Sequence, residues 1–224
     1  MRGRSGCVLP RRMEYLACPF EYEGTDSVVA VRENIELEQT NRIPRTAREL
    51  FDVFPPVSGY RQEVIAGTLI VSPLRSPEHG WLATDLLAAL LPLRQERGWR
   101  ASSGTLNICI DGSRDSLVPD CVLAPADCPR WGAYELQSQH LFLVAEVVSP
   151  SSVIRDHHEK PRIYAQGGVP VYLLIDPIAD QPAATVFSEI KDGAYQQTTR
   201  VVMGTPLYLP KPIDFELDTS IFKA

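Results

Sequence analysis

Two carboxylates and a lysine stand at unusual places in this chain. Asp120 follows a proline at the end of a short apolar run, and Glu146 lies inside a second apolar run, residues 141–148. Carboxylates seldom occur in buried-strand sequence, because an unpaired charge in the interior is costly. Lys160 lies in the polar segment that follows the second run. This combination predicts a metal site carried on a β-sheet.

The chemistry of such a site would be hydrolysis at phosphorus. A hard cation such as Mg²⁺ prefers one or two protein carboxylates and keeps its remaining positions for water and phosphate oxygens. The ion stabilises charge on a scissile phosphate and lowers the pKa of a bound water. A lysine at the position of Lys160 would orient the attacking water or balance the developing charge.

Each of these residues also has a purely structural interpretation. Asp120 after a proline is typical of a turn. Glu146 is also explained by a structural ion pair, and Lys160 by a solvated helix face. Asp156 is expected to be the N-cap of a helix, with Glu159 completing a capping box.

Other polar residues flank the predicted site. Glu63 lies in an early strand, and strand alternation leaves it free to face solvent or the site. His79 falls near the start of a helix, where we expect a surface or capping role. His157 and Tyr164 share a helix face with Lys160, because they lie three residues before it and four after it. They would flank a substrate there, and Tyr164 is equally explained as a core residue.

The charge balance limits how the protein binds polyanions. The 22 Lys and Arg residues and 28 Asp and Glu residues give 22 − 28 = −6. A nucleic-acid partner would therefore need a metal ion or a local basic surface. The candidates for a basic rim are Arg61, Arg75, Arg94, Arg155, Lys160 and Arg162.

The N-terminal half of the predicted domain contains two helices and a hairpin. Residues 46–51 predict a short helix capped by Thr46, with Glu49 at the capping-box position. Residues 60–71 predict a hairpin that turns at Ala66-Gly67. Residues 77–97 predict a long helix that ends at Gly98. Its apolar stripe has three- and four-residue spacing: Trp81, Leu82, Leu86, Leu87, Leu90 and Leu93.

The rest of the domain predicts strands around one further helix. Residues 99–110 and 117–124 are expected to be strands joined by a turn at 111–113, and 125–140 an irregular connection. Residues 141–148 predict a strand covered on both faces. The segment up to residue 169 is long enough for a helical crossover that ends at Gly167-Gly168. Residues 185–189 and 194–202 predict a late hairpin, and the whole predicts a mixed α/β fold.

Length and composition suit one globular domain with an appendage. The chain has 224 residues, of which 44% are hydrophobic and 22% charged. We expect residues 1–45 to be a variable extension of about one strand plus loop and residues 46–224 to be the domain. Met13 is an alternative start. No apolar run approaches the roughly 20 residues of a membrane span, so no membrane partner is expected.

The cysteines predict a reducing, cytoplasmic environment. There are five, an odd count, and no CxxC pair occurs. Their spacing matches no common zinc pattern, so no structural zinc is expected. A thiol enzyme that uses Cys109 or Cys121 with His140 would need an exposed cysteine of low pKa, and both cysteines lie in apolar strand sequence.

Five segments, in order along the chain, resemble the motifs of the Uma2 family of restriction endonuclease-like proteins, placed in the PD-(D/E)xK nuclease superfamily. The resemblance covers about residue 46 to residue 222. The segments are QEVIAGTL at 62–69, Pro119-Asp120, VAEVVSPS at 144–151, residues 156–160, and YAQGGVPVY at 164–172.

The resemblance implies a restriction endonuclease-like fold, a central mixed sheet flanked by helices, and a metal-dependent DNA endonuclease. Asp120 and Glu146 would be the ligands of Mg²⁺ or Mn²⁺, and Glu63 an auxiliary acid and further ligand. The superfamily lysine follows the glutamate by two residues, where this chain has Val148, so Lys160 from the following helix would replace it. The predicted substrate-binding residues are Arg155, His157 and Arg162.

Two departures from the family pattern bear on activity. Pro161 directly follows Lys160, and a proline beyond the first turn of a helix bends it and would displace the lysine. Ala66 and Thr68 stand where family members often carry acids. The alternative is therefore a non-catalytic nucleic-acid-binding or regulatory module that keeps the nuclease fold. A homodimer is expected if both strands of a duplex are cut, because that requires two sites.

Overall fold

The computed structural model describes residues 43–223 and has a mixed α/β fold. Its helical elements are α1 (Ala47–Val53), α2 (Pro77–Arg97), η1 (Ser138–His140), η2 (Arg155–Glu159), α3 (Lys160–Gln166) and η3 (Thr219–Phe222). Its strands are β1 (Tyr60–Ile65), β2 (Thr68–Pro73), β3 (Arg100–Ser103), β4 (Asn107–Cys109), β5 (Ser116–Leu117), β6 (Cys121–Ala124), β7 (Arg130–Trp131), β8 (Glu135–Gln137), β9 (Leu143–Val147), β10 (Tyr172–Asp176), β11 (Ala183–Lys191), β12 (Ala194–Val202), β13 (Leu207–Leu209) and β14 (Phe215–Leu217).

The central sheet has the strand order β12-β11-β10-β9-β6-β3 and carries both predicted carboxylates. β9 and β10 run parallel, while β6 pairs with β9 in antiparallel fashion with Cys121 opposite Ala145. This register places Asp120 opposite Glu146 on the same face of the sheet. The mixed sheet predicted from the sequence is confirmed.

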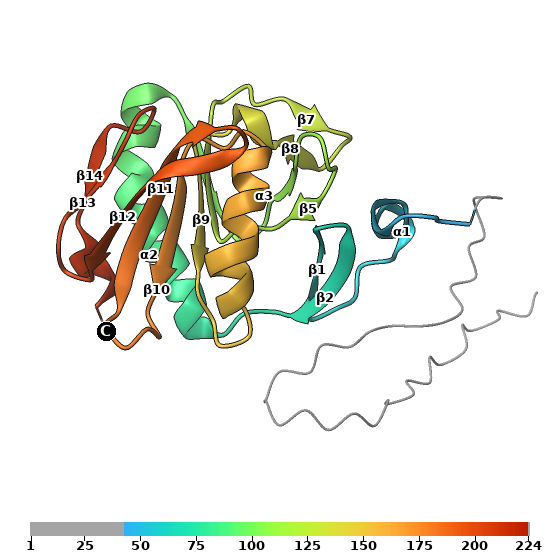
Figure 1. Ribbon diagram of the computed structural model, residues 1–224, viewed down its shortest axis with the longest axis horizontal. Coiled ribbons are helices and arrows are strands. Elements are labelled where there is room, and N and C mark those ends of the chain that lie inside the picture. Colours follow the sequence, from blue (N-terminus) through green and yellow to red (C-terminus); the bar gives the residue numbers. More distant parts are fainter. Residues whose placement is uncertain (1–42, 224) are drawn as a thin grey trace, which may run out of the picture.

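Helices cover both faces of the central sheet, with α3 in front of it and α2 behind it in Figure 1. Alternate residues of β9 enter two separate cores. Leu143, Ala145 and Val147 join the core under α2, whereas Val144 and Val148 join the core under α3. Glu146 therefore points to the α3 side, where Lys160 and Tyr164 contact it.

A second sheet, with the order β2-β1-β5-β4-β8-β7, lies beside the first. The β1–β2 hairpin turns at Ala66 and Gly67, both with positive φ, as the sequence predicted. The backbone N–H groups of Ala66 and Gly67 donate to the Asp115 carboxylate at 2.9 and 3.0 Å. The segment between β5 and β6, which contains Val118 and Asp120, passes from the second sheet to the first.

Three of the predicted elements are found almost as expected. α1 is capped by Thr46, whose side chain accepts from the Glu49 N–H. α2 begins and ends at the predicted residues, with Gly98 in the left-handed conformation as its C-cap. β11 and β12 form the late hairpin.

The stripe of α2 differs from the prediction at one end. Leu86, Leu90 and Leu93 are buried as expected, but Trp81 is 64% exposed. His79, predicted to have a surface or capping role, is buried and continues the stripe towards the N-terminus. The helix therefore buries the imidazole of His79 and leaves the indole of Trp81 exposed.

Three strand predictions were wrong in their extent. The expected strand 99–110 is split into β3 and β4 at Gly104, which has positive φ, and the two halves belong to different sheets. The expected strand 117–124 is likewise divided between β5 and β6. The segment 125–140, predicted to be irregular, contains β7, β8 and η1. Residues 1–42, including the expected N-terminal strand, Met13, Cys7 and Cys18, lie outside the described residues.

Pro161 does not displace Lys160, contrary to the expectation from sequence. The helix turns wide at η2, a π-helical segment in which the Lys160 N–H donates to the Arg155 carbonyl, five residues back. The next carbonyl, that of Asp156, has no N–H partner at Pro161. It accepts instead from the Tyr172 hydroxyl at 2.8 Å. The proline is thus accommodated without loss of a buried hydrogen bond.

None of the helices in residues 43–223 is long and apolar enough to cross a bilayer. Among the described cysteines, Cys109 and Cys121 are buried free thiols. Burial raises the pKa of the Cys109 thiol and raises that of Cys121 to about 12. Neither matches the exposed, low-pKa nucleophile that a thiol enzyme requires.

Candidate functional site

The site is built where β6 and β9 lie side by side under α3. Asp120 stands at the start of β6 and Glu146 in the middle of β9, and they are 2% and 0% exposed. The Val147 N–H donates to Asp120 Oδ2 at 2.8 Å, which fixes this carboxylate against the neighbouring strand. Both predicted carboxylates are therefore held on rigid backbone, as a metal or catalytic site requires.

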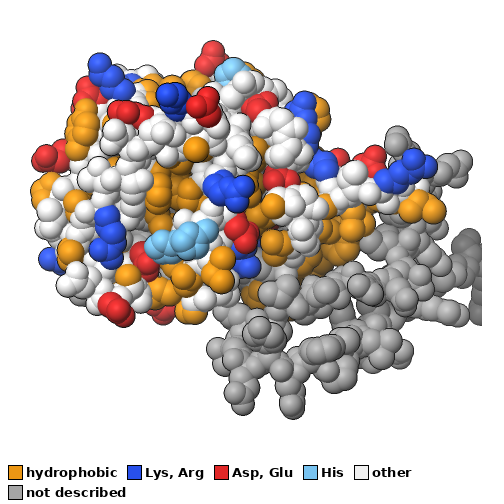
Figure 2. Space-filling view, viewed as in Figure 1, with side chains coloured by type: hydrophobic (Ala, Val, Ile, Leu, Met, Phe, Trp, Pro, Cys, Tyr) orange, Lys and Arg blue, Asp and Glu red, His pale blue; other side chains and the backbone are white. Residues whose placement is uncertain are grey.

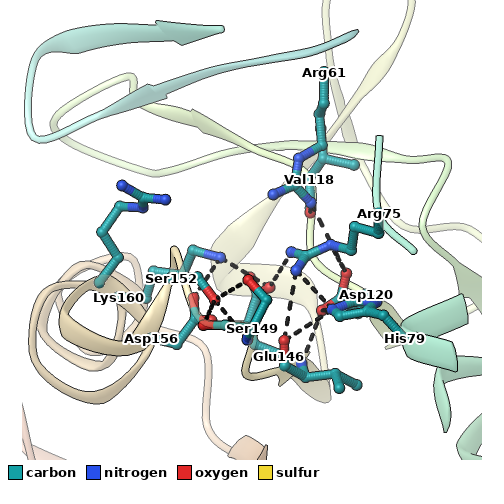
Figure 3. Close-up of polar contacts among 12 residues, drawn as sticks. Arg61, Arg75, His79, Val118, Asp120, Glu146, Ser149, Ser152, Asp156 and Lys160 are labelled. Atoms are coloured by element: carbon teal, nitrogen blue, oxygen red, sulfur yellow. Dashed lines mark hydrogen bonds and ion pairs between the residues drawn. The ribbon is translucent and has the colours of Figure 1, made fainter. Parts of the chain in front are cut away.

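Lys160 reaches Glu146 from α3, as Figure 3 shows. Its Nζ lies 2.8 Å from Glu146 Oε2 and 2.9 Å from Asp156 Oδ1. The other carboxylate oxygen of Glu146 accepts from the Tyr164 hydroxyl at 2.6 Å. The predicted lysine thus takes part in the site. Asp156, predicted to be an N-cap, is instead a fully buried partner of Lys160.

Arg75 and His79 approach the two carboxylates from the opposite side, as Figure 3 shows. Arg75 Nε lies 2.7 Å from Asp120 Oδ1, and its Nη2 lies 3.3 Å from Glu146 Oε2. His79 Nε2 lies 3.1 Å from Asp120 Oδ2 and 2.8 Å from the Val147 carbonyl oxygen. A guanidinium thus bridges the two acids.

Glu63 lies close by but contacts neither Asp120 nor Glu146. Its Oε1 accepts from the Val118 N–H at 2.9 Å, and its Oε2 forms an ion pair with Arg61 at 3.0 Å. Arg61 in turn donates to the Val118 carbonyl at 3.0 Å and lies 3.9 Å from Asp120 Oδ1. Together Glu63 and Arg61 hold the segment that leads into Asp120, and a direct role for Glu63 as a ligand stays a prediction.

Burial and charge act in opposite directions on the central groups. Burial would raise the pKa of Asp120, but the hydrogen bond from His79 and the charge of Arg75 outweigh it and lower that pKa. Burial raises the pKa of Glu146 to about 7, and repulsion from Asp120 adds to this effect. Lys160 is buried too, yet attraction from Glu146 and Asp156 raises its pKa and keeps it charged.

The predicted substrate-binding residues are not brought into this cluster. His157 Nε2 pairs with Asp176 at 2.8 Å, and Arg155 donates to the Ser151 carbonyl at 2.9 Å. Arg162 is exposed on α3. Lys160 cannot belong to a basic rim, because it is 1% exposed. On the face shown in Figure 2, Lys and Arg side chains are scattered among Asp and Glu.

The sequence missed the basic partners of the acids. His79 could have been found from the buried spacing of α2, because positions 79, 83, 86, 90 and 93 form one stripe. Arg61 and Arg75 carry no such signal. Arg61 lies on β1 and Arg75 just before α2, and only the tertiary fold brings both arginines to Asp120.

A pocket of about 290 Å³, which we call the acid pocket, opens onto the site beside α2. It is lined by Asp120 together with Arg61, Arg75 and His79. The charged groups are thus reached from solvent through a space of the size that small ligands occupy in proteins, about 300 Å³.

A solved structure shares this fold. It is described as that of "a putative nuclease belonging to DUF820" from Anabaena variabilis, with a TM-score of 0.61 and 19% sequence identity. The match covers 80% of the present chain and 97% of the other. No curated protein matches the chain.

A sequence model of the Uma2 family, described as "Putative restriction endonuclease", matches residues 48–220. This match covers all but the first residue of α1, both sheets, and the site residues Arg75, His79, Asp120, Glu146 and Lys160. Asp120, Glu146 and Lys160, which carried the resemblance in the sequence, are the residues that the fold brings together. On this evidence, the chain belongs to the Uma2 family.

Proposed function

We propose that this protein is a metal-dependent DNA endonuclease that hydrolyses phosphodiester bonds. The observation that carries the proposal is the placement of Asp120 and Glu146 opposite each other on β6 and β9, with Lys160 2.8 Å from Glu146. Membership of the Uma2 family supports it. Two carboxylates and a lysine on rigid elements are suited to phosphodiester hydrolysis.

The donor set fits Mg²⁺ or Mn²⁺. The described residues contain no cluster of three or more His, Cys, Asp and Glu side chains suited to a metal. Mg²⁺, however, binds through one or two carboxylates and keeps other positions for water and phosphate. The bridging position of Arg75 between Asp120 and Glu146 shows that the space between these acids favours positive charge. When bound, the ion would supply Lewis-acid stabilisation of the phosphate and an acidified water.

The chain's own residues would position the groups that react. The Val147 N–H and His79 fix the orientation of Asp120, and Glu63 fixes the backbone two residues earlier. Lys160, kept charged by Glu146 and Asp156, would orient the attacking water or donate to the developing negative charge. The guanidinium of Arg75 must withdraw from the two acids before an ion takes its place.

A second function is favoured by one observation. Asp120 and Glu146 already have their charge balanced by Arg75 and Lys160 within the protein. Such internal compensation would allow the fold to persist as a nucleic-acid-binding or regulatory module without catalysis. Binding of Mn²⁺ by the wild-type protein, and its loss in Asp120→Asn, would separate the nuclease from this module.

The test of the nuclease is nicking of supercoiled plasmid and cleavage of single-stranded circular DNA in Mg²⁺ or Mn²⁺, with EDTA as the blank. Asp120→Asn and Glu146→Gln are expected to lower the rate by at least about a hundredfold, because each removes an anionic oxygen ligand of the proposed metal ion. Glu216→Gln on β14, an exposed carboxylate, is the matched control and should keep full activity. Nicking that survives in both site variants would refute the proposal.

A further inference from the structure

A second, larger groove lies next to the acid pocket and is rich in aromatic side chains. It has a volume of about 670 Å³ and lies between α1, the β1–β2 hairpin and the β7–β8 region. We call it the aromatic groove and define it by Phe51, Tyr60, Leu74, Trp131 and Tyr134. Tyr60, Trp131 and Tyr134 are 40%, 38% and 86% exposed, an unusual concentration of exposed ring surface.

The aromatic groove is continuous with the acid pocket. Arg61, Leu74 and Gly104 line both spaces. A chain that lies in the aromatic groove would therefore pass Arg61 on its way to Asp120. Since Arg61 lies 3.9 Å from Asp120, the distance from the groove to the carboxylates is short.

Arginines accompany the aromatic rings. The guanidinium of Arg114 lies over the Trp131 ring, 3.7 Å from its centroid. Arg48 lies 5.2 Å from the Phe51 centroid and pairs with Glu135 at the wall of the groove. Rings interleaved with guanidinium groups are the arrangement by which proteins bind unpaired strands, with bases on the rings and phosphates along the positive charges.

The burial of the acids argues against an intact duplex at this site. Asp120 and Glu146 are 2% and 0% exposed, and Asp120 is reached through a pocket of about 290 Å³. A paired duplex keeps its phosphates on the outside of a wide cylinder, which cannot enter so small a space. An unpaired strand can, because its backbone bends into the pocket while its bases stack beside it.

We propose that the aromatic groove binds an unpaired DNA strand, with bases stacked on Tyr60, Trp131 and Tyr134 and the backbone led past Arg61 to the acid pocket. The inference rests on the proposed nuclease function and names its substrate class. It makes the groove a binding surface in its own right, independent of the metal.

Binding in EDTA tests this inference without any hydrolysis. Fluorescence anisotropy of the full-length protein with a labelled DNA of about 12 nucleotides, single-stranded or annealed to its complement, gives the two dissociation constants. We expect the single strand to bind at least about tenfold more tightly. Tyr134→Ala should weaken its binding about fivefold or more, as expected for the loss of one stacking ring.

The control is Tyr208→Ala, which removes an exposed tyrosine on β13, outside the groove. It should leave the single-strand affinity unchanged. Tyr134 is 86% exposed, so its removal is not expected to affect folding, and the melting temperature of each variant checks this. Equal or tighter binding of the duplex, tighter binding of an RNA of the same sequence, no binding of any oligonucleotide, or equal effects of Tyr134→Ala and Tyr208→Ala would each overturn the inference.

The two proposals can fail separately. Single-strand binding that depends on Tyr134, without metal-dependent cleavage of either a single strand or a plasmid, would refute the nuclease and leave the proposed strand-binding groove standing. Metal-dependent cleavage that depends on Asp120, without preferential binding of the single strand, would refute the strand-binding role of the groove and leave the nuclease proposal standing.

Discussion

At the scale of single residues, Arg75 decides how the two central acids are neutralised. It contacts both Asp120 and Glu146 with one planar group, and each contact is within 3.3 Å. A divalent cation between the acids would have to displace this group. Arg75 and the proposed metal ion would therefore compete for the same pair of charges.

Arg75→Gln should accordingly bind Mn²⁺ at least about tenfold more tightly than the wild type, measured by calorimetry. In EDTA the same variant should lose about 3 kcal/mol of stability, because two buried acids lose a partner. Arg94→Gln on α2, an exposed position, is the control and should change neither quantity. Unchanged Mn²⁺ affinity in Arg75→Gln would show that the arginine does not compete with the metal.

Glu146 gives the protein a stability that depends on pH. Burial raises its pKa to about 7 from the ordinary value of 4.5. Between these two values the folded protein keeps the proton that the unfolded chain has released, so the folded state binds more protons. The free energy of unfolding must then fall as the pH rises through this window and level off above pH 7.

The prediction concerns the difference in unfolding free energy between the wild type and Glu146→Gln in EDTA, measured by urea titration. Glutamine cannot titrate. As the pH rises from 4.5 to 7, the unfolding free energy of the wild type should therefore fall by up to about 3 kcal/mol relative to that of Glu146→Gln. A difference that stays constant with pH would mean that Glu146 is ionised throughout this range.

Residue types predicted the acids of the site but not their partners. Asp120 and Glu146 were recognisable because charges in or next to apolar runs demand compensation, whereas Lys160 was identified through the resemblance to the Uma2 family. The contact of Glu63 could not be predicted from side-chain pattern, because its carboxylate accepts from the backbone N–H of Val118. Asp156 had a sound local reason to be an N-cap, and the buried ion pair with Lys160 overrode it.

At the scale of elements, the wide turn of η2 explains how Pro161 and Lys160 coexist. In a regular α-helix, the carbonyl that faces Pro161 would have had no donor. In the π-helical segment, the carbonyl that faces Pro161 is that of Asp156, and it lies within reach of the Tyr172 hydroxyl. Such π segments frequently occur at functional sites. Here the segment sets the position of the lysine relative to Glu146.

Tyr172→Phe should therefore lower stability by about 1–3 kcal/mol, because the buried Asp156 carbonyl loses its donor. Pro161→Ala restores an N–H at the position that faces this carbonyl. In the Tyr172→Phe background, Pro161→Ala should thus restore about 1 kcal/mol of stability. In the wild-type background, the same substitution should add no such stability. Additive effects of the two substitutions in urea unfolding would contradict this explanation.

Local pattern predicted those elements that fold within one stretch of chain. α2 and the β1–β2 and β11–β12 hairpins have their periodicity, caps and turns in their own sequence. β3 and β4, and likewise β5 and β6, were each predicted as one strand, because the local sequence does not show that the pairing partner changes within the segment. Their assignment to two sheets is decided by long-range pairing, with β6 next to β9 and β5 next to β1.

At the scale of the whole molecule, a protein of net charge −6 would have to bind the proposed DNA substrate through a few local contacts. Of the six basic residues expected to form a rim, Lys160 is buried and Arg61 and Arg75 are engaged with the acids. Few of these six cations therefore remain free to contact the phosphates of a strand.

Single-strand affinity should consequently depend only weakly on salt. Each phosphate contact on a single strand contributes about 0.7 to the slope of log affinity against log salt, so two or three contacts give a slope of roughly −1.4 to −2. The measurement is anisotropy in EDTA over a range of NaCl concentrations. A slope steeper than about −4 would require an extended basic surface and contradict the local arrangement.

The stacking of Arg114 on Trp131 has an optical consequence. The chain has three tryptophans, and each lies in a different setting. Trp81 faces solvent, Trp99 packs 4.2 Å from Phe142, and Trp131 lies under a guanidinium at the groove. Replacing Trp81 and Trp99 by phenylalanine would leave one indole whose emission reports occupancy of the groove. The protein thus contains its own fluorophore at that position, and arrival of a ligand can be timed in a stopped-flow instrument without any label.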